Sequence, residues 1–348
     1  MSLAALSLKA TSKVQRQGTH TLRTGSTCLQ RAFGLAVHRE RAGHPLCSNA
    51  KRITNMESLT SEARRRALAL YADQIDDGSG GPPFDGTLLP YDICPLIEVV
   101  QWRLTMVDQL VRGELREFAN TLNAWRGELR RWYIWMGVME TFSEEDAWSL
   151  QWEFVEPIAF KCLFNPSAAR DRFTFVATNA FHQVRLAADE TYSDRLDGDP
   201  KKAGAKPRFL SRTQSEEQLV RLANALAHGA AFVDGVQSLD GEGYRDFTRN
   251  FRNLSSHAIA PRFNVGLTNT VTRRVVNATK LVEQRNGTYK EEEIAGKQAV
   301  RYGFGGTPPL PMREMFLANF EEFEKARSCF MAYVEVLDTA LGALPASS

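Results

Sequence analysis

The chain has 348 residues, 43% of them apolar, so it can bury one large core or a core with a smaller appendage. Its 43 basic and 41 acidic residues nearly cancel, which excludes a global field that would draw the whole protein onto nucleic acid or a membrane. Five cysteines without a CxxC pair argue against a zinc knuckle or a disulfide framework, and no apolar run reaches the roughly 20 residues of a membrane span, so we expect a soluble, cytoplasmic protein.

Residues 1–55 differ in composition from the rest of the chain. They carry nine basic residues and a single acid, Glu40, among many Ser, Thr and Gly. This composition fits an organelle transit peptide, a disordered tail, or a start codon placed too far upstream, with Met56 opening the protein. In each case we expect folding to begin near residue 56 and deletion of the tail to leave the folded core unchanged.

From residue 56 onward apolar residues recur at intervals of three and four, which predicts helices. The expected helices cover 58–76, 95–141 (one helix, or two joined at Gly113 or Gly127), a segment from 142, 165–192, 215–237, a segment from 240 that carries 251–257, and 312–342. Ser143, Asn165-Pro166 and Ser215 are the expected starts of the third, fourth and fifth. Aromatic residues at helical spacing are expected in the core, although the arginines beside them would also suit base stacking; these are Trp125, Trp132 and Trp135.

The segment after Pro261 has a different composition. Its content of Val, Thr and Gly, together with an Asn286-Gly287 pair typical of a tight turn, predicts a small β-hairpin near 268–304. The sequence therefore predicts a mostly α fold, in which residues 56–348 form one helical domain with a hairpin insert.

Several functional classes lack their motifs. The chain has no GxxxxGK[ST] or GxGxxG nucleotide loop, no HExxH, no GxSxG and no His/carboxylate spacing for a metal site, so we expect neither metal nor cofactor. Beyond the tail only His182, His228 and His257 remain as candidate acids or bases. His182 is expected to be a hydrogen-bonded core residue. The basic loop 199–212 suits contact with phosphates or, more simply, a solvated loop.

Residues 251–263, FRNLSSHAIAPRF, look least like packing material. They place an arginine and a histidine among small polar residues at an expected helix end, with Phe247, Phe251 and Leu254 on the core face. Five residues on a regular helix separate Arg252 from His257 by about 140°, too far for tight contact unless the helix bends. Two copies around a two-fold axis solve this geometry. Arg221 and His228, seven residues apart on one face of the expected helix 215–237, are a second candidate pair.

This stretch, with the basic TNTVTRRVV after it, resembles the signature region of HEPN-domain proteins, the prokaryotic helical bundles of toxin, phage-defence and RNA-processing systems. In that superfamily an Arg followed by a polar residue precedes a His by four to six residues near a helix end, as Arg252, Asn253 and His257 do here. The resemblance covers about residues 240–276. It implies a HEPN-like bundle that cleaves RNA without a metal ion, although several members have lost activity or only bind. We expect a homodimer, with an antitoxin or regulatory protein as a further partner.

The chemistry of RNA cleavage suits these residues. Without a metal, the reaction needs a proton removed from the 2′-hydroxyl, charge stabilised at the phosphorane and a proton given to the leaving 5′-oxygen; it leaves a 2′,3′-cyclic phosphate. Imidazole exchanges protons at neutral pH, and the guanidinium fork matches phosphate oxygens. Further residues expected to contact RNA are Ser256, Arg262, Arg273 and Arg274. Two alternatives remain open: a catalytically silent helical module that binds RNA or a protein, and a structural helix end in which Arg252 and Asn253 hydrogen-bond the chain around Pro261.

Overall fold

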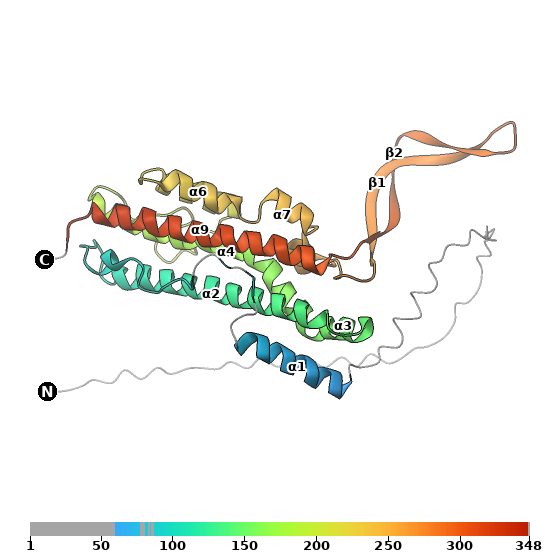
Figure 1. Cartoon of the computed structure of the whole chain (residues 1–348). Helices are drawn as coiled ribbons and strands as arrows, with labels where there is room; N and C mark the ends of the chain where they lie inside the picture. The colour runs from blue at the N-terminus through green and yellow to red at the C-terminus, as the bar shows by residue number, and fades with distance from the viewer. Residues whose placement is uncertain (1–59, 77–80, 83, 85–86, 347–348) are drawn as a thin grey trace, which may run out of the picture. The chain divides into compact units, whose positions relative to one another are not determined.

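The structure, a computed structural model, describes residues 60–76, 81–82, 84 and 87–346. The chain divides into two units, Met1–Met56 and Glu57–Ser348, and every described residue belongs to the second. The predictions made for residues 1–55 therefore lie outside the described residues. The described part is mostly helical with one two-stranded antiparallel hairpin, which confirms the predicted mostly α class with a hairpin insert (Figure 1).

Three long helices that pack against one another form the centre of the bundle (Figure 1): α2 (Val107–Met139), α4 (Glu156–Ala188) and α9 (Met312–Gly342). Phe118 of α2 joins all three, because its ring meets Phe173 of α4 and Phe330 of α9 edge to face, with centroids 4.3 and 5.8 Å away. The three tryptophans expected in the core are buried, as predicted. The bundle thus has an aromatic core of the kind that the helical spacing predicts.

Shorter elements join and cover the long helices. In chain order they are α1 (Ser61–Asp76), η3 (Pro95–Glu98), α3 (Glu144–Leu150), the π-helical turn η4 (Gln151–Val155), α5 (Arg212–Ala223), α6 (Gly229–Ser238), α7 (Glu242–Phe247) and α8 (Phe251–His257). α1 packs on α2, α5 on α4, and α6 on α9. Ser143 caps α3 as expected, since its hydroxyl accepts a hydrogen bond from the Asp146 amide at 3.2 Å.

The helix start expected at Asn165-Pro166 is wrong. α4 begins at Glu156, directly after η4, and runs through Pro166, which is buried. Proline removes the amide that would bond the carbonyl of Cys162 four residues earlier. That carbonyl instead accepts a hydrogen bond from the Asn319 side chain of α9 at 2.8 Å. A tertiary contact therefore compensates the break that the local sequence predicts.

Two other expected helices differ from the structure at three points, and left-handed residues explain two of these differences. α2 begins only at Val107, after Met106 (φ 67°), and then passes Gly113 and Gly127 without interruption. The segment expected at 215–237 is two helices, because His228 (φ 63°) precedes α6. Its first helix begins earlier than expected, with Ser211 and Gln214 forming a reciprocal capping box.

The hairpin extends slightly beyond its predicted limits. β1 (Thr268–Glu283) pairs antiparallel with β2 (Tyr289–Thr307), and the turn between them contains Gly287 at φ 78°, as the Asn-Gly pair predicts. The pairing shifts between Asn277 and Thr279, where residues 294–297 of β2 have no partner in the register. This irregularity divides the ribbon into a proximal half next to the bundle and a distal half that carries the turn.

Candidate functional site

α8 carries the Arg/His pair and is a separate short helix, whereas the sequence predicted one helix from 240 through 257. The break lies at Arg249 and Asn250, both left-handed with φ 53°. Each left-handed non-glycine residue costs about 1–2 kcal/mol, so the surrounding structure must hold this turn in place. Strained backbone of this kind gathers at functional sites. The turn gives α8 a direction of its own, independent of α7.

Two contacts fix α8 and the turn before it. The Phe251 ring is buried and meets Phe160 of α4 and Phe263 at centroid distances of 5.5 and 5.3 Å. The Arg249 guanidinium donates hydrogen bonds to the carbonyls of Pro308, and of Pro309 at 3.1 Å, which follow β2. α8 is thus held between α4 and the base of the hairpin. Phe247, expected on the core face, is instead half exposed, because the helix that would have carried it inward ends there.

A buried amide attaches α7 to the core. Asn319 of α9 accepts from the Trp125 indole at 2.9 Å and donates to the Tyr244 hydroxyl at 2.9 Å and to the Cys162 carbonyl. Burial raises the pKa of Tyr244, so its hydroxyl stays neutral. Since all of its polar atoms are paired, Asn319 links α2, α4, α7 and α9 at one point.

A second polar network forms the wall beside α7. The Arg212 guanidinium donates to both carboxylate oxygens of Asp171 at 2.6 and 2.8 Å, to Asp240 at 3.1 Å and to the Ser167 hydroxyl at 2.6 Å. The Asp240 amide in turn donates to buried Glu322 at 2.8 Å. These bonds hold the guanidinium in place and leave it committed to structural partners.

Between α4, α7 and α8 lies a cavity of about 190 Å³. Its lining is polar and basic, and consists of Leu163, Arg212, Asp240, Tyr244, Arg245, Thr248, Asn250, Phe251, Arg252 and Asn253. Arg212 is held as described, and Arg245 donates to the Asp240 carbonyl at 2.5 Å. The side chains of Arg252 and Asn253 make no hydrogen bond or ion pair within the described part of the chain. Both side chains are therefore free to meet a ligand there.

His257 lies apart from this cavity. It is exposed and is the last residue of α8, while Ser256 donates its hydroxyl hydrogen to the Arg252 carbonyl at 3.0 Å. Only one part of the alternative in which this stretch is a structural helix end therefore agrees with the structure. α8 does end at His257, but among the described residues neither Arg252 nor Asn253 bonds the chain around Pro261. That segment is held by other groups, such as the Thr268 hydroxyl, which accepts from the Arg262 amide at 3.1 Å.

The other expected RNA contacts beyond α8 lie at the base of the hairpin and along its first strand. Arg262 has an exposed side chain, and its carbonyl accepts from the Leu310 amide at 2.7 Å at the base of the hairpin. Arg273 and Arg274 are consecutive in β1, so they point to opposite faces of the ribbon. The structure therefore separates these two arginines, which the sequence grouped together.

The second candidate pair, Arg221 and His228, is not on one helix face. Arg221 is in the last turn of α5 and is ion-paired with Asp197, whereas His228 follows the end of that helix. His182, by contrast, behaves as predicted. It is buried, and its ring nitrogens lie 3.1 Å from the Tyr192 hydroxyl and 2.8 Å from the Asp194 carboxylate.

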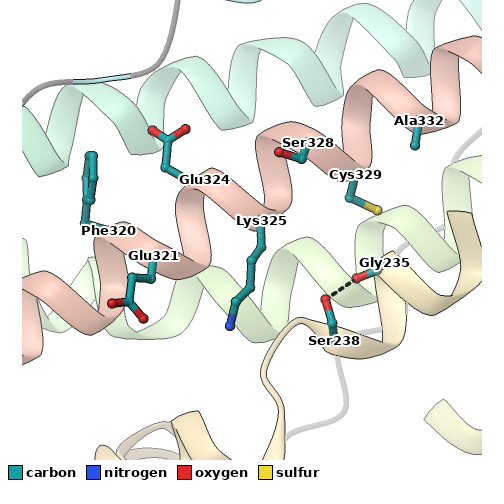
Figure 2. Close-up of a pocket in the computed structure, with 9 residues that line it drawn as sticks. All are labelled: Gly235, Ser238, Phe320, Glu321, Glu324, Lys325, Ser328, Cys329 and Ala332. Atoms are coloured by element: carbon teal, nitrogen blue, oxygen red, sulfur yellow. Dashed lines mark hydrogen bonds between the residues drawn. The ribbon is translucent and has the colours of Figure 1, made fainter. Parts of the chain in front are cut away.

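A larger, more open cavity of about 780 Å³, for which no sequence motif pointed the way, lies between α6 and α9 (Figure 2). The Lys325 ammonium on its wall is bonded to Glu322 at 2.7 Å, and Ser238 donates to the Gly235 carbonyl at 2.7 Å. Burial raises the pKa of Cys329 to about 12, which keeps this thiol protonated and a poor nucleophile.

The described residues offer neither a metal site nor a membrane-spanning helix, and the chain matches no known protein in three comparisons. No group of three or more His, Cys, Asp and Glu among the described residues is arranged to hold a metal ion. No helix within the same residues has the length and apolar character needed to cross a bilayer. Comparison with protein-family models, with curated proteins and with solved structures finds no match. The likeness to HEPN proteins therefore depends on the residues of α8 and those around them.

Proposed function

We propose that this protein is a HEPN-type endoribonuclease that cleaves RNA without a metal ion, as a toxin or phage-defence effector, with its reaction at α8. The observation that carries the proposal is the cavity beside α8, where Arg212 and Arg245 are committed to structural partners while Arg252 and Asn253 have free side chains. A rigid, basic wall with one free guanidinium suits a phosphodiester. Cys94, Cys162 and Cys329 are buried free thiols, which agrees with the reducing cytoplasm proposed as its location.

The proposed reaction is an attack within the RNA strand. His257 takes the proton of the 2′-hydroxyl as the 2′-oxygen bonds to phosphorus, and the bond from phosphorus to the 5′-oxygen breaks. The leaving 5′-oxygen gains a proton, and a 2′,3′-cyclic phosphate remains. Arg252 stabilises the charge of the pentacoordinate phosphate, and Asn253 holds a phosphate oxygen or orients the imidazole.

The proposal includes a homodimer. Arg252 lines the cavity, while His257 is five residues later and about 140° around the helix axis. One copy therefore does not present both groups to one phosphate, but two copies related by a two-fold axis bring the histidine of each near the arginine of the other. A monomer at micromolar concentration that retains cleavage, seen by light scattering, contradicts this part of the proposal.

The test is cleavage of labelled RNA by the full chain in EDTA. His257→Ala and Arg252→Ala should each slow cleavage by roughly 10²-fold or more, the usual effect of losing an acid or base group. Both side chains are exposed, so the melting temperature should not change. Products should end in a cyclic phosphate, and DNA should resist because it lacks the 2′-hydroxyl.

The chain offers a matched control for this test. Arg221 and His228 are also exposed, but they lie away from the α8 cavity. Arg221→Ala and His228→Ala should leave the rate of cleavage unchanged. Loss of cleavage in this pair, with full activity in the α8 variants, would place the reaction elsewhere.

A second candidate is a catalytically silent module that binds RNA or a partner protein. It is favoured by the exposed apolar side chains of the hairpin, which suit binding without any reaction. RNA binding by the wild-type chain without strand scission, unchanged in His257→Ala, supports this candidate over the nuclease.

A further inference from the structure

The proximal half of the hairpin has two unlike faces. The register pairs Val271 with Phe304, Arg273 with Tyr302 and Val275 with Val300. Directly opposed residues of an antiparallel pair share a face, and so do residues two apart on one strand. One face, which we call the ring face, therefore carries Val271, Arg273, Val275, Val300, Tyr302 and Phe304. The opposite face pairs Thr with Gly at two positions, then Arg274 with Arg301 and Val276 with Ala299.

The ring face is open to solvent. Its five apolar side chains are all exposed, including Tyr302 at 58% and Phe304 at 89%. An isolated two-stranded ribbon is marginally stable in water, and contiguous exposed apolar surface marks an interaction site in a folded protein. Figure 1 shows the ribbon bending part-way along its length. The ring face thus has the properties of a surface that a binding partner covers.

The charges of the hairpin indicate what that occupant is. The proximal strands, 268–277 and 298–307, contain Arg273, Arg274 and Arg301 and no acidic residue. The distal part contains all the acids of the hairpin: Glu283, Glu291, Glu292 and Glu293. The rings of Tyr302 and Phe304 therefore lie in the half that has no acids. Arg301 is ion-paired with Glu291 of the distal half at 3.6 Å, whereas Arg273 and Arg274 have no ion pair within the described residues, so this half is complementary to a polyanion.

We propose that the ring face binds single-stranded RNA, with bases against Tyr302 and Phe304 and phosphates near Arg273. The two rings are two positions apart on one strand, hence about 6.8 Å from each other, which leaves room for a base on each. Stacking on aromatic rings in a basic groove is how proteins hold single strands without sequence preference. A second copy of this chain fits less well, since a two-fold contact between ring faces brings arginines together with no acid to pair them.

The ring face is joined to the candidate catalytic helix. Arg249, in the turn before α8, bonds the carbonyls of Pro308 and Pro309 just after β2, and Phe251 of α8 contacts Phe263 just before β1. A single strand of RNA bound along the proximal hairpin is therefore held beside α8. The inference deepens the proposed function, on which its choice of RNA depends.

The test measures binding apart from cleavage. The full chain with His257→Ala is titrated against a short fluorescein-labelled single-stranded RNA by anisotropy. Adding Tyr302→Leu and Phe304→Leu together keeps the apolar bulk but removes the rings, and should weaken binding by roughly 100-fold, about tenfold for each lost base stack. Arg273→Ala should reduce the slope of log affinity against log salt by roughly 0.7, the value for one phosphate of a single strand.

Tyr289→Leu is the matched control. Tyr289 is equally exposed, at 64%, but opens β2 in the acid-containing distal half, so its loss should leave RNA affinity unchanged. The proposal is overturned if the double variant binds RNA as tightly as its parent. It is also overturned if that variant changes only the sedimentation of the protein or its flotation with anionic vesicles, since the occupant is then a second copy or a membrane.

Failure of the two proposals can be told apart. If the hairpin variant binds RNA normally while His257→Ala still abolishes cleavage, the ring face is wrong and the nuclease stands. If the wild-type chain binds RNA through the ring face but cleaves none, the nuclease is wrong and the ring face stands.

Discussion

The three-helix core and the segment from α7 to the end of the hairpin differ in the burial of their large and polar side chains. In the core, large rings such as Phe118, Trp132 and Tyr333 are fully buried, and Asn319 has every polar atom paired. In the second region Arg252, His257 and Phe304 are exposed, and three non-glycine residues hold left-handed backbone: Arg249, Asn250 and Asn264. Large rings and polar groups are thus buried in the core, whereas comparable groups of the second region are left in solvent.

This difference indicates a division between stability and recognition. A guanidinium or an aromatic ring left in solvent contributes little to folding, while a strained turn lowers stability directly. Such features persist when they serve binding or reaction, and the core supplies the stability that offsets them. We therefore expect substitutions in the two regions to affect stability differently.

The largest effect is expected in the aromatic core. Phe118→Ala leaves a cavity between Phe173 and Phe330 and should lower the free energy of unfolding by about 3–5 kcal/mol. Phe304→Ala removes a side chain of the same type from the exposed hairpin and should change it by less than about 0.5 kcal/mol. Urea denaturation of both variants measures the difference. Similar losses in the two would mean that the hairpin is buried in solution and that the contrast is false.

The next effect tests the link between the regions. Asn319→Leu is close to isosteric but leaves the Trp125 indole, the Cys162 carbonyl and the Tyr244 hydroxyl unpaired, so it should cost about 2–4 kcal/mol. Because Tyr244 attaches α7, amide exchange should also speed up in 240–257. Tyr244→Phe removes only one of these bonds and should cost about 1 kcal/mol. Exchange that rises uniformly over the chain would contradict a specific link to α7.

The sequence predicted the fold class and the core well because both follow from periodicity. Phe323, Phe330 and Leu337 of α9 recur at helical spacing and are buried as expected. It failed where a distant residue decides the outcome. Pro166 reads locally as a helix start, yet the freed carbonyl of Cys162 is satisfied from α9 by Asn319, more than 150 residues away in the chain. No local pattern carries that information.

The candidate site was predictable only in part for the same reason. Arg252, Asn253 and His257 could be found from the motif, and α8 does end at His257. The cavity could not, because Leu163, Arg212 and Tyr244 come from three separate helices, α4, α5 and α7. Arg273 and Arg274 were both predicted to contact RNA, and strand alternation then puts them on opposite faces. Arg249-Asn250 between two short helical patterns was the one local signal of the break before α8.

The smallest expected effect comes from Glu114, a carboxyl in the core whose hydrogen bonding is incomplete. Glu114 of α2 accepts a hydrogen bond from Asn179 of α4 at 2.8 Å, while its second oxygen is buried without a hydrogen bond among the described residues. Burial raises the pKa of this carboxyl, opposed in part by the Asn179 hydrogen bond. A carboxyl whose pKa is higher in the folded than in the unfolded chain contributes stability below the unfolded pKa and loses it as pH rises through the folded pKa.

Glu114→Gln should therefore be more stable than wild type near neutral pH, because it never carries the charge, and the advantage should shrink as the pH is lowered toward the unfolded pKa of glutamate. Thermal unfolding of both proteins over that range measures the difference curve. Tyr333 of α9, the other titratable group coupled to Glu114, has its pKa raised by burial and stays neutral throughout. Parallel curves would mean that Glu114 is solvated, and that the core tolerates a charge as readily as the surface around α8 does.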